Sequence, residues 1–367
     1  MPKAYHAELT PLTHIHVGTG DSISPGEYFL LPQNPEEKMP SLCVCNLGTI
    51  PEEKLGGYRQ EILKWIDANP ITWVSNVTNS ARLMEVIKSH SSYTCKISPA
   101  AYKNIKARWG KPNSELAIAT THRTIEGPII PGSSIKGAIR TALIYARLGK
   151  SPAINIDIND ERWLGKWERK VLDRDSSGSI DEDLLSALRV SDTQPSRYPT
   201  YVLLPKHIGM ADTSQELQDY RECIPRANLE KPYWLKLSLR IADDLLEKRE
   251  KKPDLLSLDG ILEACRKFYS DVLEAEIAHW EKEDTPEKKN ALEVCLNIKK
   301  MAEKHPNAAL LRLGWGCGKN SVGINIAKPH DSHPAGRVNE RFRHYPKTRV
   351  LIADCPPGWM LLRIEGK

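Results

Sequence analysis

The sequence lacks the segments that would direct it to a membrane or out of the cell. No stretch of its 367 residues approaches the run of about 18 apolar residues that a membrane-spanning helix needs. The first residues contain no apolar core of a secretory signal. We therefore expect a cytoplasmic protein with no membrane partner.

The sequence also lacks the cysteine patterns that are typical of zinc sites and of disulfide-bonded proteins. It has eight cysteines, and no two of them form a C-x-x-C pair, so zinc ribbons and zinc fingers are excluded. A disulfide framework is not expected in a long chain without a secretory signal. His14 and His16 are spaced like strand neighbours, but two ligands are too few for a metal site. We expect no metal.

A strong charge of either sign is missing as well. The formal net charge is +5, which is compatible with a nucleic-acid partner but too small to establish one. The chain is 40% hydrophobic and 27% charged, as in an ordinary soluble protein with a sizeable core. Its length suggests about two or three domains, or one domain with large insertions.

Both common nucleotide-binding motifs are absent. Gly314, Gly316 and Gly318 form a glycine-rich loop before Lys319, but the first glycine of a Walker A motif is replaced by Leu313. The third glycine of a dinucleotide fingerprint is missing too, so we expect no cofactor. The loop either lets an RNA backbone approach closely or forms a tight turn in a sheet.

What the sequence does contain is organised around residues 129–143. Pro131 and Gly132 form a turn signal, and Ser133 or Ser134 is placed to cap the helix that follows. Apolar residues recur along one helical face, whereas Lys136 and Arg140 share another. This pattern predicts either a phosphate-binding helix start or a capped surface helix with solvated cations.

Two other segments are candidates for contact with RNA. Residues 5–17 are predicted to form a strand carrying His14 and His16 on one face, followed by a glycine-rich turn over 18–22. Residues 93–126 interleave cations with aromatics, as single-stranded nucleic acid requires for backbone neutralisation and base stacking. The alternative for this segment is a solvated face with core aromatics. Its members are Tyr93, Lys96, Tyr102, Lys103, Lys106, Arg108, Trp109, Lys111, His122 and Arg123.

Periodicity divides the chain into three parts. Helical spacing occurs at 58–68, 80–89, 258–280 and 286–303. Strand patterns flank the stretch over 129–143 and return at 310–313. We predict a first part of the core over 1–207, a mostly helical insertion over 208–305, and the rest of the core with the glycine-rich loop over 306–367. A basic cluster precedes the last strands at Arg341, Arg343, His344, Lys347 and Arg349.

The central stretch resembles a known signature. Residues 130–140, read as I-P-G-S-S-I-K-G-A-I-R, resemble the P-G-S-S-L-K-G-x-[IL]-R motif of the RAMP proteins of CRISPR systems. Further stretches, in family order, resemble the type III-A (Csm) subunit at the end of the backbone filament. They are 14–20 with 25–28, 188–192, 311–316, 345–349 and 357–359.

The resemblance implies an α+β fold with a ferredoxin-like/RRM core and a large α-helical insertion. It implies a subunit that binds CRISPR RNA (crRNA) near its 3′ end, caps the filament, contacts target RNA and other Csm subunits, and supports crRNA trimming by cellular nucleases. The residues expected to contact RNA are His14, His16, Gly18, Gly20, Arg123, Ser133, Ser134, Lys136, Arg140, Arg312, Gly314, Gly316, Gly318 and Lys319.

The resemblance also bears on catalysis. The related subunit that cuts target RNA carries an Asp in a loop after its first strand, where this chain has Glu27 or Tyr28, with Asp21 offset. We therefore expect no enzymatic activity. The alternative is a metal-independent endoribonuclease of the same superfamily that processes CRISPR RNA, with His14 or His16 as general acid or base. A scaffold protein without RNA contact is a third reading.

Overall fold

The structure is a computed structural model of the chain. It describes residues 3–33, 36–37, 39–111, 115–147, 184–208, 219–228, 232–242, 256–282, 285–323 and 349–365. None of the helices in these ranges is long and apolar enough to cross a membrane.

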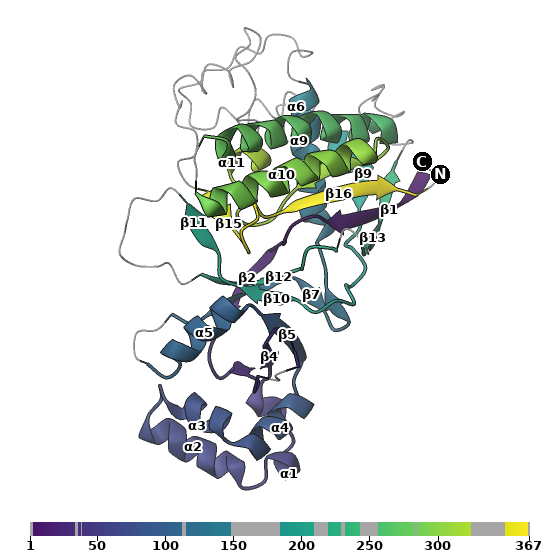
Figure 1. Ribbon diagram of the computed structural model, residues 1–367. Coiled ribbons are helices and arrows are strands. Elements are labelled where there is room, and N and C mark those ends of the chain that lie inside the picture. Colours follow the sequence, from purple (N-terminus) through teal and green to yellow (C-terminus); the bar gives the residue numbers. More distant parts are fainter. Residues whose placement is uncertain are drawn as a thin grey trace, which may run out of the picture.

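A five-stranded sheet forms the centre of the larger half of the molecule. Its middle strand β1 pairs antiparallel with β13 on one side and with β16 on the other, so residues close to both ends of the chain lie together (Figure 1). Alternate residues of β13 are buried, which places one face of the sheet against a core. In spatial order the strands are β14 (Ala309–Arg312), β16 (Trp359–Ile364), β1 (Lys3–Pro11), β13 (Leu235–Ile241) and β9 (Leu188–Val190).

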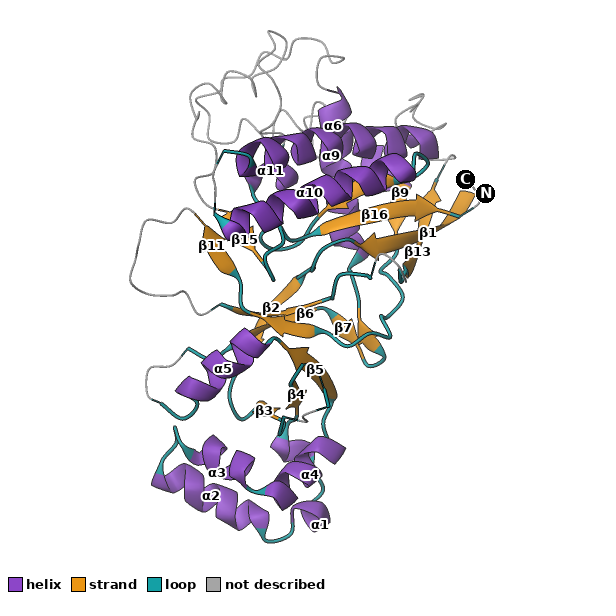
Figure 2. Cartoon of the chain, in the orientation of Figure 1, coloured by secondary structure: helices purple, strands orange, loops and turns teal. Residues whose placement is uncertain are grey.

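Helices cover one face of this sheet (Figure 2). They are α6 (Gly132–Arg147), α9 (Leu258–Trp280), α10 (Pro286–Lys304) and the short α11 (Lys319–Val322). The chain runs β1, α6, β9, β13, α9 and β16, and the spatial order β16-β1-β13-β9 is that of a ferredoxin-like fold with β14 added at one edge. The predicted α+β fold with a ferredoxin-like core is confirmed.

The predicted boundaries of the insertion were misplaced. Within 208–305, β13 is a central strand of the core sheet, and α9 packs on both α6 and β14. The helical patterns over 258–280 and 286–303 were predicted correctly, but an apolar stripe on a helix does not say which partner covers it. Residues 208–305 therefore carry a large part of the core itself.

A second sheet of seven strands lies beyond the core. Its order is β2-β6-β12-β10-β5-β4-β3, and it mixes parallel with antiparallel pairs. The strands are β2 (Gly18–Ile23), β3 (Tyr28–Leu30), β4 (Ser41–Val44), β5 (Tyr93–Ile97), β6 (Ile118–Thr121), β10 (Tyr201–Leu203) and β12 (Tyr220–Cys223).

A cluster of helices, inserted between β1 and α6, forms the far end of the elongated molecule (Figure 1). It has its own apolar core around Val77, Leu83 and Ile87, and the helices predicted at 58–68 and 80–89 are confirmed. The elements are η1 (Leu47–Thr49), α1 (Glu52–Leu55), α2 (Tyr58–Ala68), α3 (Trp73–Asn79) and α4 (Ala81–Ser89), with α5 (Pro99–Arg108) on the sheet.

Smaller elements complete the fold. The strands β7 (Arg123–Thr124) and β8 (Gly127–Pro128) form a short hairpin directly before the start of α6, and β11 (Lys206–Ile208) pairs with β15 (Arg349–Leu351). A 3-10 turn, η3 (Leu184–Ala187), leads into β9.

Candidate nucleic-acid interface

The start of α6 is capped by a residue from a distant segment. Gly132 donates its backbone N–H to Oδ1 of Asp192 at 2.7 Å, and the backbone N–H of Ile130 is bonded to Oγ1 of Thr193 at 3.0 Å. The prediction that Ser133 or Ser134 caps this helix was wrong, because the helix begins at Gly132 and both serines lie in its first turn. A carboxylate already occupies the Gly132 N–H, so this amide is not available to a phosphate.

The side of α6 that faces away from the core carries the cations. Ile135 and Ile139 are completely buried, as the apolar periodicity predicted. Ser133 and Gly137 are exposed, and Lys136 and Arg140 are partly exposed, one turn apart. The cationic face of the helix therefore reaches the surface, and any phosphate contact comes from its side chains.

The two histidines lie inside the protein. The strand predicted over 5–17 ends at Pro11, and the predicted glycine-rich turn over 18–22 is the strand β2. The segment between them crosses from one sheet to the other, so both faces of it are covered and His14 and His16 are 6% and 1% exposed. Their predicted place on an exposed strand face was wrong, whereas Gly18 and Gly20 are exposed in β2.

Burial keeps both imidazoles neutral. Loss of solvation, with a smaller effect of the Arg226 charge, lowers the pKa of His14 to about 3. Burial also lowers the pKa of His16, whose Nδ1 is hydrogen-bonded to the backbone oxygen of Glu222 at 2.7 Å. Neither side chain can reach a substrate on the surface, which removes the geometric basis for the endoribonuclease alternative.

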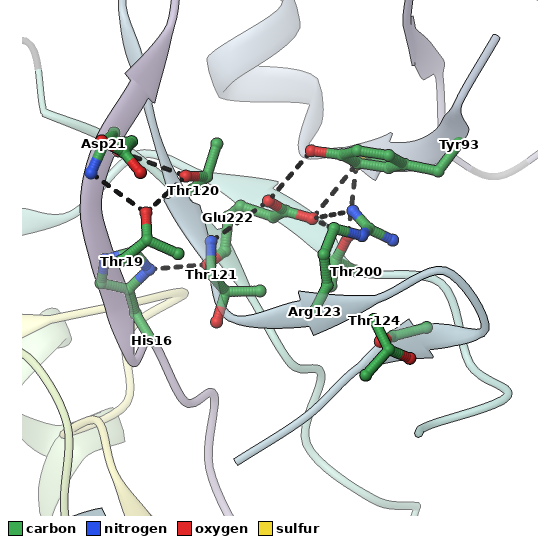
Figure 3. A network of polar contacts seen from close by, with 12 residues as sticks. His16, Thr19, Asp21, Tyr93, Thr120, Thr121, Arg123, Thr124, Thr200 and Glu222 are labelled. Atoms are coloured by element: carbon green, nitrogen blue, oxygen red, sulfur yellow. Dashed lines mark hydrogen bonds and ion pairs between the residues drawn. The ribbon is translucent and has the colours of Figure 1, made fainter. Parts of the chain in front are cut away.

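Arg123 belongs to a polar network around Glu222 (Figure 3). Glu222 is 1% exposed and accepts hydrogen bonds from Oγ1 of Thr200 at 2.6 Å, the Thr121 backbone at 3.2 Å and Nη1 of Arg123 at 2.9 Å. The Arg123 guanidinium also lies 3.1 Å from the centre of the Tyr93 ring. These contacts hold Arg123 in a fixed position, and its charge is compensated within the protein.

Arg312 lies in the core, not on the RNA-contacting surface where the prediction placed it. It is 2% exposed, and its Nη1 lies 3.4 Å from Oε1 of Glu276, a buried carboxylate on α9. Its Nε donates to the backbone oxygen of Pro357 at 3.1 Å. The residue sits on a core-facing strand, where a charged side chain is tolerated because it is paired and hydrogen-bonded.

Part of the glycine-rich loop packs inside the protein. Gly314 has a φ of +94°, and a Cβ there would lie 2.5 Å from the backbone oxygen of His16, so no larger residue fits. Trp315 donates its backbone N–H to the same oxygen at 2.8 Å. Gly316 packs similarly against Pro357, whereas Gly318 and Lys319 are exposed. The tight-turn reading therefore accounts for the first two glycines.

A part of the basic and aromatic segment over 93–126 lines a groove on α5, together with Gln33 and Pro40. Tyr102, Lys103 and Lys106 line one side of it, and the volume is about 440 Å³. The Lys106 ammonium lies 5.7 Å from the centre of the Tyr102 ring. Cations beside an aromatic face suit a nucleic-acid strand, which needs charge neutralisation and a stacking surface.

The remaining predicted cations fall into two groups. Arg349 is 6% exposed and its Nε lies 3.2 Å from Glu276, so it is part of the core. Arg341, Arg343, His344 and Lys347 lie outside the described residues. In the parts of the chain that are described, no group of histidine, cysteine and carboxylate side chains is arranged to hold a metal ion.

Segments that are far apart in the sequence meet around His14 and His16. The residues predicted to contact RNA do not all lie together there. His16 contacts both the Gly314–Trp315 loop and Glu222, which connects it to Arg123, while Lys136 and Arg140 lie on a different element. Sequence reasoning missed Glu222, because nothing in its surroundings forms a motif. Asp192 lies in the stretch over 188–192 that resembles the family, and this resemblance is the signal that could have drawn attention to it.

Comparison with known proteins found a relative that is similar in sequence over part of the chain. The chain is 34% identical over 122 residues to the CRISPR system Cms protein Csm5 of Streptococcus thermophilus, a match that spans 31% of this chain and 33% of the relative. The chain therefore matches only about a third of that relative's length.

Two solved structures share the fold over almost the entire chain. One chain of a Csm–crRNA–target RNA ternary complex from a type III-A CRISPR-Cas system has a TM-score of 0.67 and 20% identity, covering 98% of this chain and 100% of its own. Csm5 of T. onnurineus has a TM-score of 0.63 and 21% identity, covering 96% and 99%. A model of the RAMP superfamily matches residues 8–321, and the chain belongs to this superfamily.

Proposed function

We propose that this protein is the crRNA-binding subunit that caps the backbone filament of a type III-A CRISPR effector complex near the crRNA 3′ end. The observation that carries the proposal is the match, over 98% of the chain, to a subunit of a Csm–crRNA–target RNA complex. The other Csm subunits, crRNA and target RNA are its partners under this proposal. Support for the trimming of the crRNA 3′ end by cellular nucleases is part of the same role.

Two surfaces are suited to this task. The first is the cationic face of α6, formed by Ser133, Lys136, Gly137 and Arg140, and the second is the groove on α5 with Tyr102, Lys103 and Lys106. A guide RNA varies in sequence, so it must be held by its backbone, and phosphate contacts carry no sequence information. Exposed Gly18, Gly20, Gly318 and Lys319 are further candidate contacts.

The proposal includes the absence of catalysis by this subunit. His14 and His16 are buried and neutral, and the chain has Glu27 or Tyr28 where the target-cleaving relative carries its catalytic Asp, with Asp21 offset. Repeat-containing RNA incubated with the protein in EDTA is expected to remain intact. Cleavage that disappears in His14→Ala or His16→Ala would instead favour the endoribonuclease.

The RNA contact is tested by charge reversal on α6. The double variant Lys136→Glu/Arg140→Glu is expected to bind single-stranded RNA more weakly. If both residues contact phosphates, the slope of log affinity against log salt becomes shallower by about 1.4. The measurement is filter binding at several salt concentrations, together with the crRNA content of the purified complex.

The matched control reverses two exposed lysines in the helical cluster, Lys54→Glu/Lys64→Glu. It changes the net charge equally but lies far from α6, so it should leave the salt slope unchanged. Equal losses in both double variants would mean that only net charge matters. Full crRNA content after reversal on α6 would contradict the proposed contact.

A further inference from the structure

The tip of the β7–β8 hairpin presents a completely exposed isoleucine. Ile125 has a relative exposure of 104%, and the next most exposed large apolar side chain in the described ranges is Val322 at 64%. Ile125 makes no contribution to the core, so burial of its side chain within this chain does not explain an apolar residue at this position.

The hairpin beneath Ile125 is held firmly. Arg123 at its base is fixed by the buried Glu222 and by the Tyr93 ring. The backbone N–H of Glu126 is bonded to Oγ1 of Thr124 at 3.2 Å, which closes the turn. These contacts fix the hairpin at its base and at its turn, which lowers the loss of backbone entropy when a partner binds the tip.

A second segment braces the hairpin and adds another apolar side chain. Ser196 donates its backbone N–H to the Pro128 oxygen at 2.8 Å, and a Cβ at Gly127 would lie 2.4 Å from the Ser196 oxygen. Two residues further on, Tyr198 is 50% exposed and its ring lies 4.4 Å from that of Tyr233. Ile125 and Tyr198 thus stand on two neighbouring, interlocked segments.

The charges of the hairpin favour a protein partner over RNA. Arg123 is committed to Glu222, and the residue directly after Ile125 is the exposed Glu126. A negative charge beside the apolar tip opposes a phosphate backbone, whereas it suits an apolar pocket with a basic rim. We propose that Ile125 inserts into an apolar pocket of a neighbouring protein subunit, with Tyr198 contacting its edge. This inference rests on the proposed membership of a multi-subunit complex.

The test places a photoreactive benzophenone amino acid at position 125 in the complex assembled by coexpression with the other Csm subunits and crRNA. Irradiation is expected to join this chain to one protein subunit, identified by mass spectrometry of the cross-linked peptide. A cross-link to RNA, or none to either partner, would overturn the proposal.

Substitution supplies an independent measurement. Ile125→Asp is expected to reduce the amount of this chain recovered with a tagged partner subunit by about tenfold, because burial of an isoleucine side chain is lost. Ile125→Leu should restore recovery. The matched control is Ile71→Asp, at a site 45% exposed in the helical cluster, which should be recovered like the wild type.

Two further readouts separate this inference from the proposed function. The isolated Ile125→Asp protein should keep its RNA affinity and its melting temperature, since the side chain touches no core. Normal recovery with the partner combined with weaker RNA binding would make the tip an RNA contact and refute the protein pocket. Loss of RNA binding in the α6 double variant alone leaves the pocket unaffected.

Discussion

At the scale of single residues, Gly137 stands out on the cationic face of α6. It lies in the middle of a sixteen-residue helix, it is exposed, and a Cβ there would meet no atom within 4 Å. Glycine inside a helix is less favourable than alanine, and no internal contact explains its presence. Close approach of an external backbone between Lys136 and Arg140 would explain it.

The variant Gly137→Ala is therefore expected to change two properties in opposite directions. The free energy of unfolding should rise by about 0.5–1 kcal/mol, since alanine is the better helix former. RNA affinity should fall, because the added methyl group holds the RNA backbone away. Urea unfolding and filter binding on the same preparation measure both quantities.

Asn290→Ala, at an exposed site within α10, is the control for this prediction. It should also stabilise the protein, but with no change in RNA affinity. If Gly137→Ala binds RNA as tightly as the wild type, the close approach at this position is refuted.

His14 makes the fold sensitive to acid. Its pKa is about 3 in the folded protein against 6.5 for a solvated imidazole, so between these values only the unfolded chain takes up the proton. Its contribution to stability is complete above pH 6.5 and is lost as the pH falls towards 3. From pH 6.5 to pH 5 the loss is about 2 kcal/mol.

The variant His14→Phe keeps a buried ring but cannot be protonated. Its free energy of unfolding should fall by about 2 kcal/mol less than that of the wild type between pH 7.5 and pH 5, measured by urea titration. The lowered pKa of His16 contributes to acid sensitivity in both proteins. Parallel pH profiles would show that His14 is solvated in the folded state.

At the scale of elements, the start of α6 is capped by a segment that lies about 60 residues later in the sequence. Asp192 caps the helix start, and Thr193 is bonded to Ile130 just before it. The quoted stretch over 188–192 thus combines the edge strand β9 with the cap of α6, and the two motifs hold one another in place.

Removing this cap tests the connection. Asp192→Ala should lower the free energy of unfolding by about 1–2 kcal/mol, the usual loss for a helix cap, as measured by urea unfolding. Asp192→Asn keeps the oxygen acceptor and should recover most of that stability. Equal stability of the alanine variant and the wild type would show that the helix start has another acceptor.

Sequence patterns predicted the helices and strands better than the elements against which they pack. The helices at 58–68, 258–280 and 286–303 were predicted directly from apolar periodicity, because each packs one apolar side against the protein. The same patterns could not assign α9 to the core. The histidine segment over 14–17 was mistaken for a strand, since a covered crossing between two sheets alternates in polarity as a strand does.

The candidate site was predicted unevenly for a similar reason. The cationic face of α6 follows from local helical spacing, so Lys136 and Arg140 were found correctly on one face. Arg312 and Arg123 were read as surface cations, yet Glu276 and Glu222 bind them from other elements. Ion pairs between segments far apart in the chain leave no local pattern.

At the scale of the whole molecule, two sheets are joined by residues that no single element contains. The His16 backbone oxygen binds the Gly314–Trp315 loop, and its ring binds the Glu222 backbone in the seven-stranded sheet. Segments from the beginning, middle and end of the sequence therefore meet where the sheets adjoin. These contacts fix the position of one sheet relative to the other.

The outer strands of both large sheets bear on how the protein behaves at high concentration. In the described part of the chain, β9 and β3 span three residues and β14 spans four, and β2 carries a register shift between Gly18 and Ser22. Short or irregular outer strands offer few consecutive backbone groups to another copy. Edge-to-edge pairing of copies into β-rich aggregates is thereby discouraged, even where many copies of the chain are brought close together.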